Sequence, residues 1–520
     1  MSAATAAASG QEGRSLLPWI VAAGLCLLAV FSRAPSFAMS VVDWDESLYF
    51  IMAEQWRAGH LPYTAVWDNK PIGIYTIFAA FQSIFGDRIF SMRLAALLAV
   101  AGTALLIWRI ARQLLRDRPP VLAELCAGAA GALFILTSIP DDGIAANTEI
   151  FMEAFTCLGL LWALTPVGRI GAMRAVGIGF ALGLAFMIKY VAVFDMFAVF
   201  AVMLLRPERL GRGLAALGAV IRQGLLFSLG ALIPFLAAAA LYAASGAFPV
   251  FVRASLLSNL RRVDVPVSGE GVLGAYDHQI ALFPLLYAGL VWLVVEGIRG
   301  KPCRRLMLFW VVTSALGVAS GGLYFSHYFL QILPVLCVAA GLLLAAAVSL
   351  RPALPRVGLL VLALLSLWPL AQAIGPDLGR MIAVAGRPPV PGFGLLRDTP
   401  ARVAADLRPE LVAAPGETIY VFDGEPVLYS LTHARLPTRY VFPSFLQSRL
   451  LAHMIGIDPM AVLDGIMAER PLFVIRRTNP DDGNAATRNL DVYARMQADL
   501  TAGYTVWRRY DTMVVWRRKS

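Results

Sequence analysis

Charged side chains are scarce in this chain of 520 residues. Asp, Glu, Lys and Arg make up 15% of it, whereas hydrophobic residues make up 58% and the mean hydropathy is +0.68. Soluble domains usually carry about 25% charged residues, so the composition excludes a soluble enzyme with a single anchor. The apolar runs are long and continuous rather than short and alternating, which also excludes a membrane β-barrel. We therefore expect an α-helical polytopic membrane protein.

Lysine and cysteine are scarce as well. The 44 basic residues outnumber the 34 acidic ones, giving a net charge of +10. In a membrane protein the cytoplasmic loops account for such an excess, so no nucleic-acid partner is expected. The five cysteines lie in apolar segments without a CxxC pair, so neither a disulfide framework nor a metal site is predicted. Almost all the basic residues are arginines, because the lysines are only Lys70, Lys189, Lys301 and Lys519.

Long apolar stretches predict about 11 transmembrane helices. They lie near residues 16–31, 92–114, 121–139, 148–165, 173–188, 190–205, 223–244, 280–298, 305–320, 327–348 and 357–374. A further stretch, 71–85, is shorter. Basic clusters follow every second span, on the side of Arg14, only if 71–85 does not cross. We therefore predict a juxtamembrane or re-entrant helix at 71–85 in the first outer loop, a cytoplasmic N-terminus and an outer C-terminus.

The composition changes near residue 375. We divide the chain into a transmembrane domain, 1–374, and an extracytoplasmic domain, 375–520. Strand-like runs and one helical pattern predict that the second domain is a small α/β fold. The strands are expected at 418–422, 472–475, 504–509 and 513–516, and the helix around 459–470.

Three carboxylates stand together after the first span, at Asp43, Asp45 and Glu46. Carboxylates beside an apolar boundary are costly unless they are used or solvated. One interpretation is that Asp43 or Asp45 caps a helix from Glu46 to Ala58. A cap also fixes a carboxylate rigidly, so capping and catalysis are compatible.

Two of the four lysines lie at outer membrane boundaries. Lys70 precedes Pro71 at the start of the predicted juxtamembrane helix, and Lys189 lies where two spans meet. Each is a candidate phosphate ligand, because an ionisable group at such a place is a functional hypothesis by default. The alternatives are a snorkelling lysine for Lys70 and a turn marker for Lys189.

Other polar residues lie in the remaining outer loops. Glu149 begins a span, and the pair His327-Tyr328 opens another. Arg261 and Arg262 could bind phosphate in bidentate fashion. Simpler interpretations are a favourable acidic residue in a first helical turn, an interfacial aromatic belt and solvated arginines.

Taken in order, these motifs resemble those of the GT-C glycosyltransferases that use polyprenyl-phosphate sugars, of the protein O-mannosyltransferase and aminoarabinose-transferase kind. The resemblance covers about residues 16–350 and extends to the stretch 420–426 followed by Tyr429. It rests on five features: Asp43-x-Asp45-Glu46, Lys70-Pro71, Asn147-x-Glu149, Lys189, and His327-Tyr328.

The resemblance implies a role for each candidate residue. Asp45 is the expected catalytic base, with Glu46 and Asp43 supporting it. The acceptor or base environment is expected from Glu149, Tyr49 and Tyr328. Aminoarabinose transferases have an arginine where this chain has Leu48, so a phosphate-binding arginine has to come from elsewhere. The predicted donor-phosphate ligands are Lys70, Lys189, Arg261, Arg262 and His327.

We therefore predict an inverting glycosyltransferase of the bacterial inner membrane. It would move a sugar from a polyprenyl-phosphate donor to an envelope glycan, a glycolipid such as lipid A, or a protein in the periplasm. Besides donor and acceptor, the expected partners are membrane lipids. No cofactor is predicted, although the Asp-x-Asp pattern leaves a divalent metal open. The alternatives are a transporter or lipid flippase, which commonly has inverted repeats and charges near the midplane, and a non-catalytic assembly or sensor protein.

Overall fold

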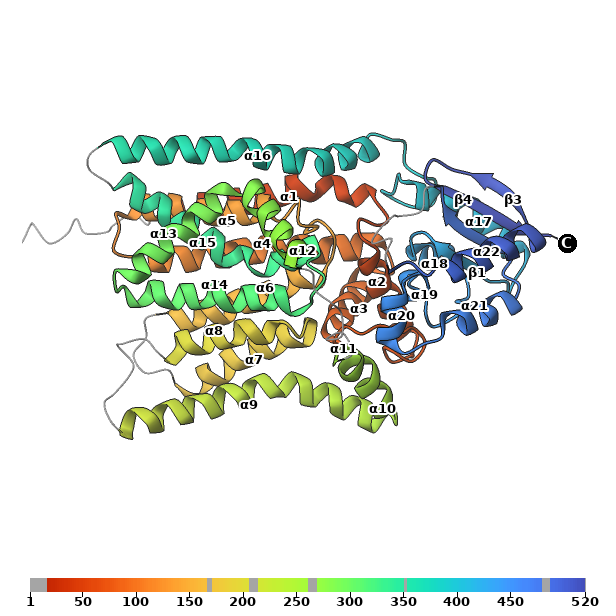
Figure 1. Cartoon of the computed structure of the whole chain (residues 1–520), viewed down its shortest axis with the longest axis horizontal. Coiled ribbons are helices and arrows are strands. Elements are labelled where there is room, and N and C mark those ends of the chain that lie inside the picture. The colour runs from red at the N-terminus through yellow and green to blue at the C-terminus, as the bar shows by residue number, and fades with distance from the viewer. Residues whose placement is uncertain are drawn as a thin grey trace, which may run out of the picture.

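The computed structural model describes residues 16–165, 171–204, 214–260, 269–349, 353–478 and 487–519. These residues form an elongated bundle of helices with a smaller α/β domain at one end (Figure 1). The long helices of the bundle are α1 (Leu17–Arg33), α4 (Ile89–Leu114), α5 (Pro120–Thr137), α6 (Thr148–Leu164), α7 (Ala172–Ile188), α8 (Ala192–Leu204), α9 (Leu214–Ala244), α13 (Pro284–Ile298), α14 (Pro302–Ser320), α15 (Leu333–Val348) and α16 (Ala353–Ala385). Shorter helical segments join them: α10 (Phe248–Phe251), the π-helix η2 (Val252–Leu257), α11 (Ser258–Leu260), α12 (Gly269–Leu282) and the 3-10 helix η4 (Ser326–Gln331).

The chain is a polytopic helical membrane protein. Most of the predicted apolar stretches coincide with one helix of the bundle. The stretch 280–298 instead crosses a bend of 103° between α12 and α13, and 327–348 is divided between η4 and α15. Among the described residues, six helices are long and apolar enough to cross a membrane, or up to eight if each of two bent helix pairs is one span. Several other apolar helices are shorter than this limit, so the count of eleven spans stays a prediction.

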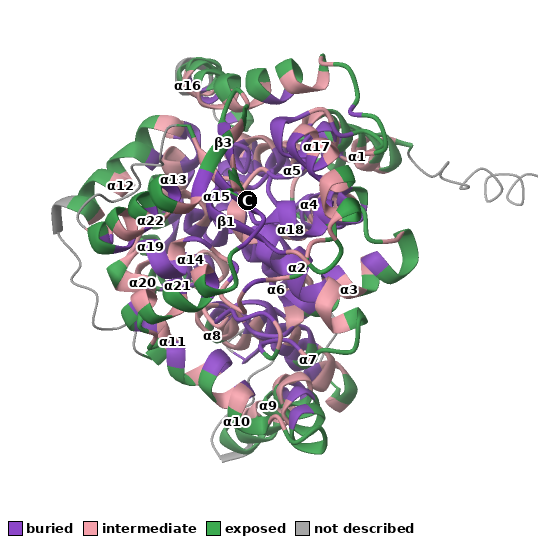
Figure 2. Ribbon diagram, turned by 90° about the vertical axis from the view of Figure 1, so that its right-hand side faces the viewer, coloured by how far each residue is buried: buried purple, intermediate pink, exposed green. Residues whose placement is uncertain are grey.

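Apolar side chains cover the outside of the bundle. Figure 2 shows buried residues at its centre and exposed ones around its edge. Large side chains are exposed on the outermost helices, including Trp19 of α1, Leu225 of α9 and Trp368 of α16, each at least 68% exposed. A surface of this kind suits contact with lipid rather than water.

The predicted first outer loop folds into helices that lie between the bundle and the small domain (Figure 1). They are η1 (Ala34–Ala38), α2 (Trp44–Arg57) and α3 (Gly73–Phe85). Helix α2 begins where it does because Asp43 has an extended backbone and its carboxylate accepts a hydrogen bond from the Asp45 amide at 3.3 Å. Capping by Asp43 is thus confirmed. The sequence had predicted that this helix begins at Pro71. In the structure, helix α3 begins at Gly73.

The break between α7 and α8 lies at Lys189, as predicted. Helix α7 ends at Ile188, and Lys189 has an extended backbone, with φ at −150°. Helix α7 also packs tightly on α9 through glycines. A Cβ atom at Gly183 would overlap the carbonyl oxygen of Ala231, and one at Gly230 would overlap that of Val176. Small residues at these positions let the two backbones approach closely.

The small domain contains a four-stranded mixed sheet, ordered β1-β2-β4-β3. The four predicted strands are confirmed as β1 (Ile419–Asp423), β2 (Phe473–Arg477), β3 (Tyr504–Arg509) and β4 (Met513–Arg518). Strand β1 pairs with β2 in parallel, with Ile419 beside Phe473, and the other pairs are antiparallel. The helices of the domain are α17 (Thr399–Ala413), α18 (Val427–Thr432), α19 (Ser444–Gln447), α20 (Arg449–Ile455), α21 (Pro459–Ala468) and α22 (Leu490–Gly503). Helix α16 continues past position 374 to Ala385 before this domain begins.

Candidate active site

A cavity of about 730 Å³ lies where the bundle, the first outer loop and the C-terminal domain meet. Its wall is charged and aromatic on all three sides. The residues that line it include Asp43, Trp44, Asp45, Asn69, Lys70, Asp142, Lys189, Asn259, His327, Tyr328, Arg380, Phe442, Phe445, Arg477 and Arg488. Residues far apart in the sequence therefore line one cavity.

Asp45 and Lys70 form an ion pair on this wall. The Asp45 Oδ2 atom lies 3.4 Å from Lys70 Nζ and accepts a hydrogen bond from the Tyr49 hydroxyl at 3.1 Å. Tyr49 is one helical turn further along α2, so both side chains lie on the same face. Burial opposes ionisation of Asp45, but the charges of Lys70 and then His327 outweigh it and hold the pKa of Asp45 below its usual range. Asp45 is therefore a carboxylate at neutral pH.

Asp43 has the opposite electrostatic environment. Burial is the largest effect, and the nearby negative charges of Asp45 and Glu46 add to it, raising the pKa of Asp43 to about 7. A hydrogen bond with Asn147 reduces this shift in part. The two aspartates on either side of Trp44 therefore have different protonation states over a range of pH.

Lys189 is held on another part of the wall by α6 and η4. Its ammonium forms an ion pair with Glu149 and lies 4.3 Å from the centre of the Tyr328 ring. His327 Nε2 lies 4.0 Å from Glu149 Oε1, whose partner oxygen accepts a hydrogen bond from Thr148 at 2.9 Å. Glu149 is 1% exposed, so it lies behind Lys189 and orients it.

Glu46 lies away from the cavity and is fully buried. Its carboxylate forms a bidentate pair with Arg93 of α4, at 2.6 and 2.7 Å. It also accepts hydrogen bonds from the backbone amides of Val42 at 2.6 Å and Ala146 at 2.7 Å. Both oxygens are occupied, so Glu46 joins the start of α2 to α4 and to the loop before α6.

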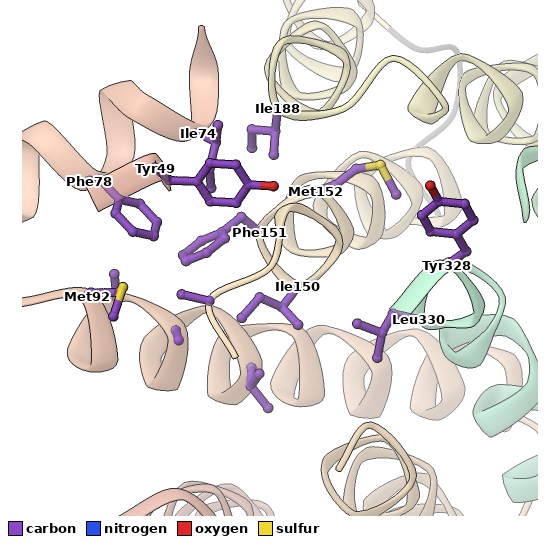
Figure 3. Close-up of a cluster of buried hydrophobic side chains, with 14 of the residues drawn as sticks. Tyr49, Ile74, Phe78, Met92, Ile150, Phe151, Met152, Ile188, Tyr328 and Leu330 are labelled. Atoms are coloured by element: carbon purple, nitrogen blue, oxygen red, sulfur yellow. The ribbon is translucent and has the colours of Figure 1, made fainter. Parts of the chain in front are cut away.

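Buried apolar side chains pack behind the charged residues of the cavity wall. Figure 3 shows Tyr49 beside Phe78 and Phe151, and Tyr328 above Leu330. The Tyr49 and Phe78 ring centres are 5.9 Å apart and the planes are perpendicular, and Phe78 packs on Phe151 in turn. Such surroundings lower the local dielectric constant and strengthen the ion pairs above them.

The structure brings most of the predicted site residues together. Asp43, Asp45, Lys70, Lys189, His327 and Tyr328 line the cavity, while Tyr49, Glu149 and Glu46 lie behind its wall. Arg261 and Arg262 lie outside the described residues. Asn259 of α11 lines the cavity, and its amide donates a hydrogen bond to the Asn69 carbonyl at 2.7 Å.

Sequence reasoning missed several residues of the site. Arg93 had a usable signal, since it lies at the outer end of a predicted span, against the usual charge distribution. Arg380, Arg477 and Arg488 had none, because arginines are frequent throughout the C-terminal part. Among the described residues, no group of three or more His, Cys, Asp or Glu side chains is placed to hold a metal ion.

Comparisons with known proteins match this architecture. Residues 69–248 match the family described as dolichyl-phosphate-mannose-protein mannosyltransferase. The chain is similar to ArnT from Cupriavidus metallidurans bound to undecaprenyl phosphate, with 15% identity and a TM-score of 0.54 over 96% of this chain and 98% of that one. It is also similar to the Archaeoglobus fulgidus oligosaccharyltransferase tethered with an acceptor peptide, with 12% identity and a TM-score of 0.53 over 98% of this chain and 74% of that one. A comparison with curated proteins finds no match by sequence.

The structural matches show the fold of the whole chain, and the family match covers one part of it. The helical bundle with its small C-terminal domain has the fold of ArnT and of the oligosaccharyltransferase. Over residues 69–248, the chain is similar to mannosyltransferases that use dolichyl-phosphate-mannose as donor.

Proposed function

We propose that the protein is an inverting glycosyltransferase that moves one sugar from a polyprenyl-phosphate donor to an acceptor outside the cytoplasm. The observation that carries this proposal is the pairing of Asp45 with Lys70, 3.4 Å apart, on one wall of a cavity that also contains Lys189. A base and two cations in one space are what attack at C1 and departure of a phosphate require.

The donor phosphate is assigned to Lys70, Lys189 and His327. The Lys189 ammonium is paired with Glu149 and lies against the Tyr328 ring, so its position is fixed before any anion binds. Fixed cations stabilise charge that develops on a leaving group, because they need no reorganisation during the reaction. The isoprenoid chain would follow the apolar surface of the bundle, as expected for a lipid-linked donor. ArnT binds undecaprenyl phosphate, which supports a donor of this class.

Asp45 is assigned the role of base. It takes the proton from the acceptor nucleophile while a new bond forms at C1 and the bond from C1 to the phosphate oxygen breaks. A single displacement of this kind inverts the anomeric centre. Lys70 links the two events: a phosphate that attracts Lys70 weakens its hold on Asp45, so donor binding makes Asp45 more basic.

The acceptor is assigned to the side of the cavity formed by the C-terminal domain. This wall carries Arg477 and Arg488 together with Phe442 and Phe445. It can bind an envelope glycan, a glycolipid or a protein. The oligosaccharyltransferase takes an acceptor peptide, whereas arginines suit an anionic acceptor. The proposed setting is the bacterial inner membrane, with about eleven spans, a cytoplasmic N-terminus and the cavity facing the periplasm.

Replacing the proposed base tests this function. We expect Asp45→Asn to reduce sugar transfer by about 10²- to 10⁴-fold, the usual contribution of a general base. The assay supplies polyprenyl-phosphate sugars to the protein in lipid nanodiscs and detects the released polyprenyl phosphate and the product by mass spectrometry.

The matched control is Glu124→Gln. Glu124 is also buried and paired with an arginine, Arg112 at 3.0 Å, but it lies in α5 away from the cavity. It should retain wild-type turnover. Retained turnover in a folded Asp45→Asn variant would reject the assignment of the base. Movement of a labelled polyprenyl phosphate across liposomes by both proteins, without transfer, would favour the flippase alternative.

A further inference from the structure

Two tryptophans adjoin the motifs that carry the proposed base and phosphate ligand. Trp44 lies between Asp43 and Asp45 at the start of α2, and Trp67 precedes Lys70 by three residues. Trp67 is 5% exposed and does not line the cavity. A packed indole is large and has few rotamers. The residues that pack against it therefore also restrict the backbone next to it.

The C-terminal domain covers both indoles with one short segment. Phe442 meets Trp44 edge to face, with ring centres 6.2 Å apart and an interplanar angle of 87°. Phe445 meets Trp67 at 5.2 Å and 80°, and Tyr440 lies 6.2 Å from Trp67. Phe442 and Phe445 also contact one another, at 5.2 Å. We call the three residues of the C-terminal domain, Tyr440, Phe442 and Phe445, the aromatic clamp.

Polar contacts fasten the clamp on both sides. The Trp67 amide donates a hydrogen bond to the Arg439 carbonyl at 2.9 Å, and the Arg439 guanidinium donates to the Tyr63 carbonyl. Arg477 lies over the Trp44 ring, 4.4 Å from its centre, and is paired with Glu425 at 3.4 Å. Trp44 is therefore held between two groups of the C-terminal domain.

Other contacts dock the C-terminal domain in one orientation. The Asp398 carboxylate accepts hydrogen bonds from the amide and the hydroxyl of Ser40, at 2.6 and 2.7 Å. The Ser430 hydroxyl donates to Glu54 of α2. Ser40 and Glu54 lie on either side of Trp44 in the sequence, so the clamp presents its rings to Trp44 and Trp67 in a fixed position.

We infer that the aromatic clamp sets the relative position of Asp45 and Lys70, which makes the C-terminal domain a positioning part of the active site. The inference rests on the proposed function for its catalytic consequence only. Phe442 and Phe445 also line the cavity, and their positioning role comes from their contacts with Trp44 and Trp67. The clamp acts by keeping two motifs, 25 residues apart in the sequence, within hydrogen-bonding reach of each other.

The lysine content of the chain allows a test that needs no turnover. Pairing with Asp45 lowers the reactivity of the Lys70 amine toward an acylating reagent such as acetic anhydride. Phe442→Leu and Phe445→Leu should raise the acylation rate of Lys70 by about 5-fold, the factor expected for one lost aromatic pair. Mass spectrometry resolves the four lysines, and Lys301 and Lys519 serve as internal references.

Trp507→Leu is the matched control for folding of the domain. It removes an aromatic pair of the same kind, with Phe473 at 5.1 Å, within the sheet and away from Trp44. This variant should leave Lys70 acylation unchanged. Unchanged acylation in both clamp variants, or an equal rise in Trp507→Leu, would overturn the inference.

Sugar transfer adds a second readout. Phe442→Leu should lower kcat by up to about 10²-fold, the effect of misplacing a reacting group by about 1 Å, with a smaller change in the donor KM. Phe442→Tyr keeps the ring and should restore kcat. A change in KM alone would overturn the positioning role. If wild-type protein transfers no sugar, the proposed function fails, while Lys70 acylation still decides the clamp.

Discussion

Asp43 and Asp45 are separated by one residue, yet their surroundings shift the pKa values of their carboxyl groups in opposite directions. Lys70 and His327 outweigh burial at Asp45, whereas no cation does so at Asp43. Two carboxyl groups with separated pKa values are a common basis for dividing acid and base roles in one site. Here the group with the lowered pKa is the one paired with Lys70.

The raised pKa of Asp43 predicts a pH-dependent stability. The folded protein holds this proton up to about pH 7, compared with an ordinary pKa of 3.8. The resulting stability is fully present below the ordinary pKa and is lost as the pH rises through 7. Asp43→Asn keeps the helix cap but cannot ionise. Its Tm relative to wild type should therefore increase, by about 2 °C or more, between about pH 5 and pH 8.

Thermal unfolding of the purified protein across this range measures the effect. Asp458→Asn changes the exposed N-cap of α21 and provides the control. A Tm difference for Asp43→Asn that stays constant with pH, or falls as the pH rises, would contradict the predicted titration.

At the scale of elements, the start of α2 is fixed by a buried ion pair. Glu46 is in the first turn of α2 and Arg93 is in the first turns of α4, and both are at most 1% exposed. Because Glu46 also binds the Ala146 amide, this pair connects the Asp45 motif to the loop that leads to Glu149. The residue that sequence patterns assigned to catalysis thus orients two motifs at once.

Breaking this pair from one side should be costly. Arg93→Met leaves the Glu46 carboxylate without its cation, and we expect a loss of about 3–5 kcal/mol of stability. Glu46→Leu combined with Arg93→Met should recover part of that loss, because no buried charge remains, but it should not recover sugar transfer. Chemical and thermal unfolding in detergent measure the first effect, and the transfer assay measures the second.

The control for the buried pair is Arg112→Met, which removes the more exposed partner of Glu124. It should cost clearly less stability than Arg93→Met. Equal losses for the two variants would show that burial does not decide the energetics of the pair. Full transfer activity in the double variant would remove the orienting role of Glu46.

At the scale of the whole molecule, local sequence patterns predicted the helices and strands, and they predicted the part of the site that lies in the bundle and in the loop before α4. Hydrophobic periodicity located the four strands of the sheet, and charge at span ends located Lys70 and Lys189. The contribution of the C-terminal domain could not be predicted, because the contacts of Trp44 with Phe442 and Arg477 join residues about 400 positions apart and depend on docking. Periodicity gives the side of a helix but not its partner.

One further property of the whole molecule follows from the glycine contacts between α7 and α9. Because these backbones touch, the two helices form one unit, and Lys189 stands at its outer end. Helix α9 has 31 residues and is about 46 Å long at 1.5 Å per residue. The hydrocarbon core of a bilayer is about 30 Å thick, so α9 has to tilt or extend beyond it.

Bilayer thickness should therefore influence donor binding. In liposomes of phosphatidylcholines with increasing chain length, we expect the Kd for undecaprenyl phosphate to vary by about 3- to 10-fold, since mismatch costs fractions of a kcal/mol per Å. Gly183→Ala, which separates the two helices, should weaken this dependence, whereas Gly218→Ala in an open part of α9 should preserve it. A Kd that is the same in every lipid would rule out the coupling. Through one rigid helix pair, the protein would sense the thickness of its own membrane.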